Sequence, residues 1–341
     1  MLPTAPSSPL LLGIESSCDD TAAAVVAGGV LRSNVVSSQR VHAGFGGVVP
    51  ELASRAHQRL IVPVVDAALA EAGVAKSDLD AVAVTYGPGL AGSLLVGLSF
   101  AKALALGLGI PLVGVNHLEG HLYSVFVEPP GPPFPYLCLT VSGGHTQLVV
   151  VRDGFQHEVL GSTRDDAAGE AFDKVAKMLG LGYPGGPVID RLARDGDPTF
   201  QSFPRTRLGD YDFSFSGIKT SVLYYLNRFS DAERETVLTE HLGDIAASFQ
   251  TAVVDVLVGA IRDAVRATGI RSVAVVGGVS ANSQLRRDAA AAAETDGFDL
   301  FIPKPVYSVD NAAMVAVTGH FKWAAGVESP LTLSAAPNLA I

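Results

Sequence analysis

The chain has 341 residues, which is long enough for two domains or one large α/β unit. Hydrophobic residues make up 48% of the chain and charged residues only 17%, which indicates extensive burial and argues against a disordered protein, a coiled coil or a solenoid of charged repeats. The net charge of −10 argues against a general basic surface for nucleic acid. A nucleic-acid partner therefore has to be bound locally or with the help of other proteins.

Signals for export or membrane insertion are weak. The apolar start of the chain has no basic region and no small-residue cleavage site before Glu15, which argues against a signal peptide. The longest apolar stretch, residues 91–115, contains Lys102 and is expected to be a buried helix followed by a strand, not a transmembrane span. Only two cysteines occur, too few for a disulfide framework. We therefore expect a cytoplasmic protein.

Each half of the chain opens with the same order of elements. Apolar runs at residues 10–14 and 22–26 flank the polar loop 15–21 and predict a β-hairpin. The order of strand, small polar loop and strand returns at residues 136–141 and 147–151. Because both halves open with the same order of strand, polar loop and strand, the sequence predicts two related α/β halves.

The first half continues with helices and a further strand. Residues 51–72 are expected to form a helix that is interrupted or kinked at Pro63, and residues 80–85 a strand. An apolar helix is expected at about 90–106. The proline-rich stretch 128–135 is the best candidate for a linker between the halves.

The second half alternates helices and strands. Apolar residues recur every three or four positions from Leu242 to Val265 and predict one long helix that stops at Gly269. The elements expected after it are a strand at 272–276, a Gly-rich loop at 277–282, an Ala-rich helix ending near 294, a strand at 300–303 and a closing helix from Asp310. This order predicts an α/β fold with a parallel or mixed sheet.

The sharpest candidate for chemistry is the segment from His117 to His121. On a helix, positions i and i+4 point within about 40° of each other, so both imidazoles can bind one metal ion. The alternative is a polar helix start with two partly exposed histidines. The zinc-protease signature has glutamate directly after the first histidine, whereas Glu119 comes one position later, which argues against that mechanism. Asp310 is a candidate for the third ligand.

Two Gly-rich loops, residues 142–146 and 277–282, are candidates for phosphate contacts, because missing side chains let backbone N–H groups approach phosphate oxygens. Tight turns without a ligand are the alternative for either loop alone. Together with the loop at 15–21 they predict a nucleotide between the two halves. Neither a P-loop nor a Rossmann motif occurs.

A third candidate site is the acidic segment 165–174 with the glycine- and proline-rich loop 182–187. Asp173 and Asp190 could hydrogen-bond to ribose or substrate hydroxyls. The alternative for the acidic segment is a solvated helix face.

The motifs of the chain, in order, are Glu15–Thr21, Gly46–Arg55, Gly87–Leu90, Asn116–His121, Val141–Thr146, Asp166–Lys174, Tyr183–Pro187, Phe213–Thr220, Gly277–Asn282 and Asp310–Ala312. Together they resemble the bacterial TsaD family over residues 11–326. Its members are tRNA N6-adenosine threonylcarbamoyltransferases, formerly described as sialoglycoprotein endopeptidases. The resemblance implies the two-lobed actin-like, sugar-kinase-like (ASKHA) fold with the active site in the interlobe cleft. We expect an N-terminal lobe at 1–130, a C-terminal lobe at 131–309, and a closing helix and tail at 310–341 that return to the N-terminal lobe.

The resemblance also implies roles for individual residues. The family's metal ligands match His117, His121 and Asp310; the metal is usually assigned as iron, with zinc reported for relatives. Glu15 and His145 match positions close to the reacting centre, and the choice of general base stays open. The threonylcarbamoyl-adenylate site matches Thr140, Val141, Ser142, Gly143, Gly144, Asp173, Gly186, Asp190 and Asn282.

The reaction implied is attack by N6 of adenosine 37, in tRNAs that read codons beginning with A, on the carbamoyl carbon of threonylcarbamoyl-adenylate, with AMP leaving. The implied partners are tRNA, a related TsaB-type subunit that forms a heterodimer through the apolar helix after residues 87–89, and a TsaE-type ATPase; no membrane is involved. Because both halves are acidic, the chain alone is expected to bind tRNA weakly.

Some residues depart from the family pattern. Asp20 stands where many members have glutamate, Val309 stands where threonine is frequent, and residues 334–337 lack an Arg-Pro-Arg sequence, which leaves the role of the tail open.

Two alternative functions are a metal-dependent protease and a non-catalytic ATP-binding scaffold of the actin-like type. Cleavage of a glycoprotein would favour the first, and modified adenosine in tRNA digests would reject the second.

Overall fold

The structure, a computed structural model, describes residues 8–45, 47–209 and 211–341. Gly46, which opens one of the motifs above, and the first seven residues of the chain lie outside the described part. The chain divides into two compact units. Unit 1 consists of residues 1–131 and 309–341, and unit 2 of residues 132–308.

The sheet of unit 1 has five strands in the order β3-β2-β1-β4-β5. They are β1 (Leu10–Glu15), β2 (Asp20–Ala27), β3 (Val30–Ser38), β4 (Ala81–Gly87) and β5 (Leu112–Asn116). The first three strands form antiparallel pairs, which confirms the predicted hairpin, whereas β4 pairs in parallel with β1 and with β5. The sheet is therefore mixed.

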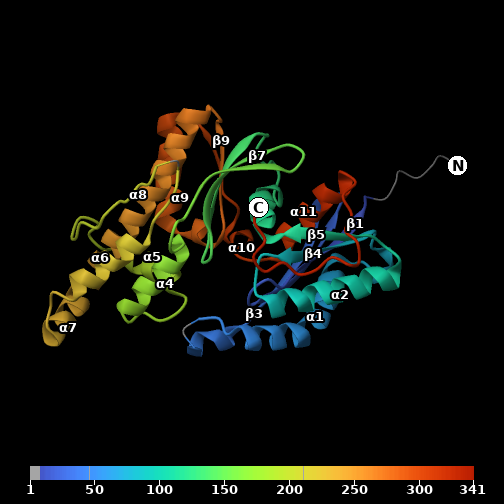
Figure 1. The fold of residues 1–341 in the computed structure, drawn as a ribbon, viewed down its shortest axis with the longest axis horizontal. Coiled ribbons are helices and arrows are strands. Elements are labelled where there is room, and N and C mark those ends of the chain that lie inside the picture. Colours follow the sequence, from blue (N-terminus) through green and yellow to red (C-terminus); the bar gives the residue numbers. More distant parts are fainter. Residues whose placement is uncertain (1–7, 46, 210) are drawn as a thin grey trace. The chain divides into compact units, whose positions relative to one another are not determined.

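Helices cover both faces of this sheet (Figure 1). Leu12, Ile14 and Val84 face α1 (Pro50–Ala72) and α2 (Ala91–Leu108), and the residues that alternate with them face α11 (Ala312–Ala324). Gly13 is one of these alternating residues, and a Cβ at this position would lie only 2.5 Å from the backbone nitrogen of Ala316. Helix α1 contains Pro63 and runs without interruption.

Helix α2 differs from the expectation of a buried helix. It and α8 (Leu242–Thr268) are long and apolar enough to cross a membrane by length and composition, but α8 is 72% buried and α2 only 33%. The inward face of α2 carries small residues such as Gly97 and Ala101, which let it pack closely, while Leu95 and Leu106 are exposed. The prediction of burial is wrong because only one face of α2 packs, with Leu94 and Leu98 beside its small residues, while the apolar residues of the other face are exposed.

Unit 2 repeats the strand arrangement of unit 1. Its order, β10-β9-β6-β7-β8, again has an antiparallel three-stranded segment followed by two parallel strands. The strands are β6 (Tyr136–Val141), β7 (Thr146–Arg152), β8 (Gln156–Ser162), β9 (Ser272–Val276) and β10 (Asp299–Phe301). The two related α/β halves predicted from the sequence are confirmed.

The helices of unit 2 enclose its main core, with α8 at the centre of the apolar contacts. They are α4 (Ala168–Met178), α5 (Gly185–Ala193), α6 (Ser216–Leu226), α7 (Asp231–Glu240), α8, α9 (Ser283–Asp296) and α10 (Pro305–Ser308). As predicted, α8 stops at Gly269, which adopts a left-handed conformation with φ of 72°. Among the described residues, the other α-helix of unit 1 is α3 (His117–Tyr123), which follows β5 without a loop.

Candidate metal centre

Helix α3 places the two predicted histidine ligands one turn apart. Asn116 ends β5 and caps α3, because its side-chain oxygen accepts a 2.8 Å hydrogen bond from the amide of Leu118. The rings of His117 and His121 lie 4.7 Å apart between centroids, and both residues are buried. The alternative of two partly exposed histidines is therefore wrong. Asp310, which lies just before the start of α11, brings its carboxylate next to both imidazoles.

The donor atoms of these residues have the spacing of ligands around one ion. The Nε2 atoms of His117 and His121 lie 3.5 and 3.2 Å from Oδ1 of Asp310. Donors about 2.1 Å from a common ion, at bond angles of about 90–110°, are separated by roughly 3.0–3.4 Å. The three side chains, all from unit 1, thus form a group that fits a divalent metal ion.

Glu15 lies behind His117, at the end of β1. It is fully buried, and its Oε2 lies 3.3 Å from Nδ1 of His117 and accepts a 2.6 Å hydrogen bond from the hydroxyl of Thr85. Its Oε1 accepts a 2.5 Å hydrogen bond from the amide of Ser17. A carboxylate on the far nitrogen of a histidine ligand fixes the tautomer and orientation of that ring.

The contact between Glu15 and His117 shifts the pKa values of both groups. Burial alone lowers the pKa of His117, but the carboxylates of Asp310 and Glu15 raise it to about 9. Burial raises the pKa of Glu15, but the charge and hydrogen bond of His117 bring it below its ordinary value. Both groups are therefore ionised at neutral pH in the metal-free chain, and an incoming ion has to displace the proton of His117.

Glu119 does not belong to this group, although it lies on α3. Its carboxylate forms an ion pair with Lys322 of α11. A protease of the zincin type needs a glutamate next to the metal-bound water. The position of Glu119 therefore agrees with the sequence argument against that mechanism.

The structure adds residues that the sequence did not single out. Thr85 binds Glu15, and its only sequence signal is a polar residue at the carboxyl end of a predicted strand. His57, on the buried face of α1, donates from Nε2 to the carbonyl of Cys18 at 3.0 Å and accepts at Nδ1 from the hydroxyl of Thr21 at 2.8 Å. Burial lowers the pKa of His57, so a neutral imidazole supports the loop after Glu15.

The predicted adenylate-binding residues gather in unit 2, at the carboxyl ends of β6 and β9. Thr140 and Val141 end β6 and are buried, and residues 142–145 form a turn closed by a 2.8 Å hydrogen bond from the amide of Ser142 to the carbonyl of His145. Gly277 lies against this strand end, because a Cβ there would be 2.5 Å from the carbonyl oxygen of Val141. A Cβ on Gly143 or Gly144 would meet nothing within 4 Å. The turn is thus open to a ligand.

The other predicted residues of unit 2 are connected through α5. Asp173 accepts a 2.7 Å hydrogen bond from the amide of Gly185, next to Gly186, and burial raises its pKa. Asp190 accepts from the amide and the hydroxyl of Ser283 at the start of α9. Asn282 caps α9 by accepting from the amide of Leu285 and donates to Gln250 at 2.6 Å. Its side chain thus already has partners in the protein.

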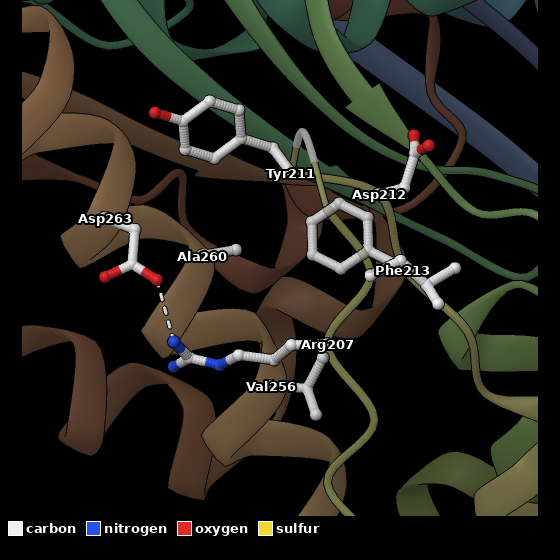
Figure 2. A pocket seen from close by; sticks show the side chains of 8 residues that line it. Arg207, Tyr211, Asp212, Phe213, Val256, Ala260 and Asp263 are labelled. Carbon is white, nitrogen blue, oxygen red and sulfur yellow. Dashed lines mark hydrogen bonds and ion pairs between the residues drawn. The ribbon is translucent and has the colours of Figure 1, made fainter.

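A cavity of about 300 Å³ lies elsewhere in unit 2, between α8 and the segments 207–208 and 211–213. Figure 2 shows Tyr211 and Phe213 beside it, with Arg207 paired to Asp263. The distance between Nη1 of Arg207 and Oδ2 of Asp263 is 2.7 Å. None of the predicted site residues lines this cavity, and its arginine is neutralised.

Comparison with solved structures shows the fold of the chain. It resembles full-length HypF in its phosphate- and nucleotide-bound form with a TM-score of 0.61 at 14% identity, over 92% of this chain and 46% of that one. It also resembles component A of (R)-2-hydroxyglutaryl-CoA dehydratase from Acidaminococcus fermentans, with a TM-score of 0.53 at 16% identity, over 93% of this chain and all of that one. These neighbours have the ASKHA-type, actin-like fold, which confirms the predicted fold class.

Comparison with curated sequences gives much higher identities. The chain is 66% identical over 331 residues to the tRNA N6-adenosine threonylcarbamoyltransferase of Salinibacter ruber, covering 97% of this chain and 99% of the relative. It is 54% identical over 341 residues to the enzyme of the same name from Symbiobacterium thermophilum, covering 98% of each. The sequence profile of TsaD, tRNA N6-adenosine threonylcarbamoyltransferase, matches residues 30–317. The chain therefore belongs to the TsaD family.

Proposed function

We propose that this chain transfers the threonylcarbamoyl group of threonylcarbamoyl-adenylate to N6 of adenosine 37, in tRNAs that read codons beginning with A, and releases AMP. Family membership gives the class of reaction, a threonylcarbamoyl transfer to tRNA. The single observation that carries the proposal is the group of two buried imidazoles and one partly exposed carboxylate in unit 1.

His117, His121 and Asp310 would hold one divalent ion, Fe²⁺ in the first place and Zn²⁺ as the alternative. Two imidazoles and a carboxylate with open coordination positions suit both ions. Bound there, the ion would act as a Lewis acid on a carbonyl oxygen of the donor. The chain itself contributes the rigid placement of the three side chains, two of which are buried.

Glu15 would orient His117 and would not remove the proton of the attacking amine. Both of its oxygens accept hydrogen bonds within unit 1, and the side chain is closed to solvent. When the proton of the imidazole is on Nδ1, facing Glu15, the Nε2 lone pair of His117 is free for the metal. His145, in the open turn after β6, remains the candidate for accepting the proton of the attacking amine.

The loops of unit 2 would hold the adenylate part of the donor. The open backbone at Gly143 and Gly144 supports this assignment, because its N–H groups could approach phosphate oxygens. Asp173 and Asp190 would accept hydrogen bonds from hydroxyl groups of the ligand. Backbone donors near the phosphate would stabilise AMP as it leaves.

The proposed protein partners are a TsaB-type subunit and a TsaE-type ATPase in the cytoplasm, with tRNA as the acceptor. The exposed apolar side chains of α2, among them Leu95 and Leu106, support a protein contact on this helix. Replacing both leucines by aspartate should abolish co-elution with the TsaB-type subunit in gel filtration. Unchanged co-elution would place that contact elsewhere.

The test of the proposed function compares Asp310→Ala with Asp153→Ala, an exposed aspartate in a turn of unit 2. Each variant is purified, analysed for bound metal, and incubated with its partners, threonine, bicarbonate, ATP and tRNA. Nucleoside mass spectrometry should detect threonylcarbamoyl-adenosine with Asp153→Ala and none with Asp310→Ala, which should also lose its metal. Full metal content and full transfer by Asp310→Ala would overturn the proposal.

A further inference from the structure

The last thirteen residues, 329–341, are called the tail here, and they are fixed to unit 1. Four of their backbone groups bond to β4, β5, α2 or the turn that precedes α2. The pairs are the amide of Ser329 with the carbonyl of Leu112 at 2.7 Å, Nζ of Lys102 with the carbonyl of Leu333, the amide of Ala336 with the carbonyl of Tyr86 at 2.8 Å, and the amide of Gly89 with the carbonyl of Pro337 at 3.1 Å.

Side-chain packing fixes the tail as well. Leu333 and Ala335 pack against the core formed by α1, α2 and the sheet of unit 1. Gly87 leaves room for the tail, because a Cβ there would lie 2.1 Å from the carbonyl oxygen of Ala336. Lys102, the one charge in an otherwise apolar helix, is used to bind a tail carbonyl. The tail is thus an integral part of unit 1.

The tail ends on the residue that starts the metal-binding helix. The side-chain nitrogen of Asn116 donates a 2.9 Å hydrogen bond to the carbonyl of Ala340. The side-chain oxygen of the same amide accepts from the amide of Leu118. Asn116 is only 4% exposed. One buried amide therefore connects the tail to the first turn of α3.

This connection matters because α3 has only seven residues and carries both histidines. A helix of that length is not stable by itself and depends on its cap and its packing. The two ends of an amide are different, one a donor and one an acceptor. While the carbonyl of Ala340 binds the nitrogen, the oxygen of Asn116 has to face the amide of Leu118.

We propose that the tail is part of the metal centre: the carbonyl of Ala340 fixes Asn116, and Asn116 fixes the helix turn that presents His117 and His121. Asn116 is then a positioning residue and touches neither metal nor substrate. The inference rests on the metal site of the proposed function. It assigns a role to a segment whose sequence carries no chemical motif.

The test uses the full chain and three changes. The first ends the chain after Leu339, which removes Ala340 and Ile341 and keeps the other tail contacts described above. The second, Asn116→Ser, keeps a good helix cap but cannot reach Ala340. The third, Asn338→Ala, is the control, because this side chain is exposed in the same segment. Zn²⁺ affinity is measured by competition with a chromophoric chelator, and exchange of the α3 amides is measured in the metal-free chain.

Truncation and Asn116→Ser should each weaken Zn²⁺ binding about 3- to 10-fold, the effect of losing one neutral hydrogen bond. The double variant should be no weaker than the stronger single change, because both break the same connection. Both should speed exchange at Leu118, and Asn338→Ala should change neither quantity. Additive effects, or unchanged affinity and exchange in the truncated chain, would overturn the inference.

Failure of the inference differs from failure of the proposed function. If the unaltered chain binds one Zn²⁺ and truncation changes neither affinity nor exchange, the tail has no role and the metal site stands. If the unaltered chain binds no metal, the metal part of the proposed function fails. In that case exchange at Leu118 still decides whether the tail fixes α3.

Discussion

Glu15→Gln changes one buried oxygen to an amide nitrogen and leaves the size of the side chain almost unchanged. One end of the new amide faces the N–H of Ser17, which can only donate, so the glutamine oxygen should turn towards it. The NH₂ group then faces Thr85 and Nδ1 of His117. A donor at this position favours the tautomer of His117 with its proton on Nε2, the atom that would bind the metal.

The expected result is a metal affinity 10- to 100-fold lower, about 1.4–2.7 kcal/mol, which is the usual effect of losing the carboxylate behind a histidine ligand. Chelator competition with Zn²⁺ measures it. Glu119→Gln removes a carboxylate from the same helix and should bind as the unaltered chain does, since Glu119 pairs with Lys322. Unchanged affinity with lost transfer would refute the reasoning and indicate that Glu15 acts on a proton of the substrate.

Three further predictions concern stability, measured by denaturant unfolding of the metal-free chain. Burial, with nearby carboxylates, raises the pKa of Asp20 to about 6. Its ionisation therefore opposes folding as the pH rises from 4 to 6. Asp20→Asn should stabilise the chain at pH 8, by at most about 3 kcal/mol, and should not stabilise it at pH 4. Partial burial raises the pKa of Asp165, but four hydrogen bonds from residues 214–216, at the start of α6, bring it below its ordinary value. Because Asp165 is exposed to solvent, Asp165→Asn should cost only about 1 kcal/mol at pH 7, and an equal cost well below pH 4 would contradict this. Gly13→Ala should cost about 1–3 kcal/mol by overpacking against Ala316, whereas Gly107→Ala in α2, where a Cβ meets nothing within 4 Å, should stabilise by about 0.5–1 kcal/mol.

The fold could be predicted wherever the pattern is local. The apolar runs before and after residues 15–21 gave the first hairpin, and the spacing from Leu242 onward gave α8 with its end at Gly269. The exposure of α2 could not be predicted from apolar content, because which face packs depends on where β4 and α1 lie. The closing helix was expected from Asp310, but it begins at Ala312 with Asn311 as its cap.

The metal group was predictable in part, because two of its three ligands lie close together in the sequence. His117 and His121 are four positions apart, so helix geometry alone brings them together. Asp310 is remote in sequence, and only the resemblance to a family placed it with them. Thr85 gave little signal, and Ala340 gave none, because Ala340 acts through a backbone carbonyl that every residue type carries.

The interruption of unit 1 by unit 2 has a consequence for biosynthesis. His121 leaves the ribosome 189 residues before Asp310, and all of unit 2 is made in the interval. Domains generally fold in the order in which they are synthesised. During that time the nascent chain displays two imidazoles without their carboxylate, a set with less charge and one ligand fewer than the finished site. Selection of the ion is therefore postponed until translation is almost complete, and a prematurely terminated chain cannot assemble the full ligand set.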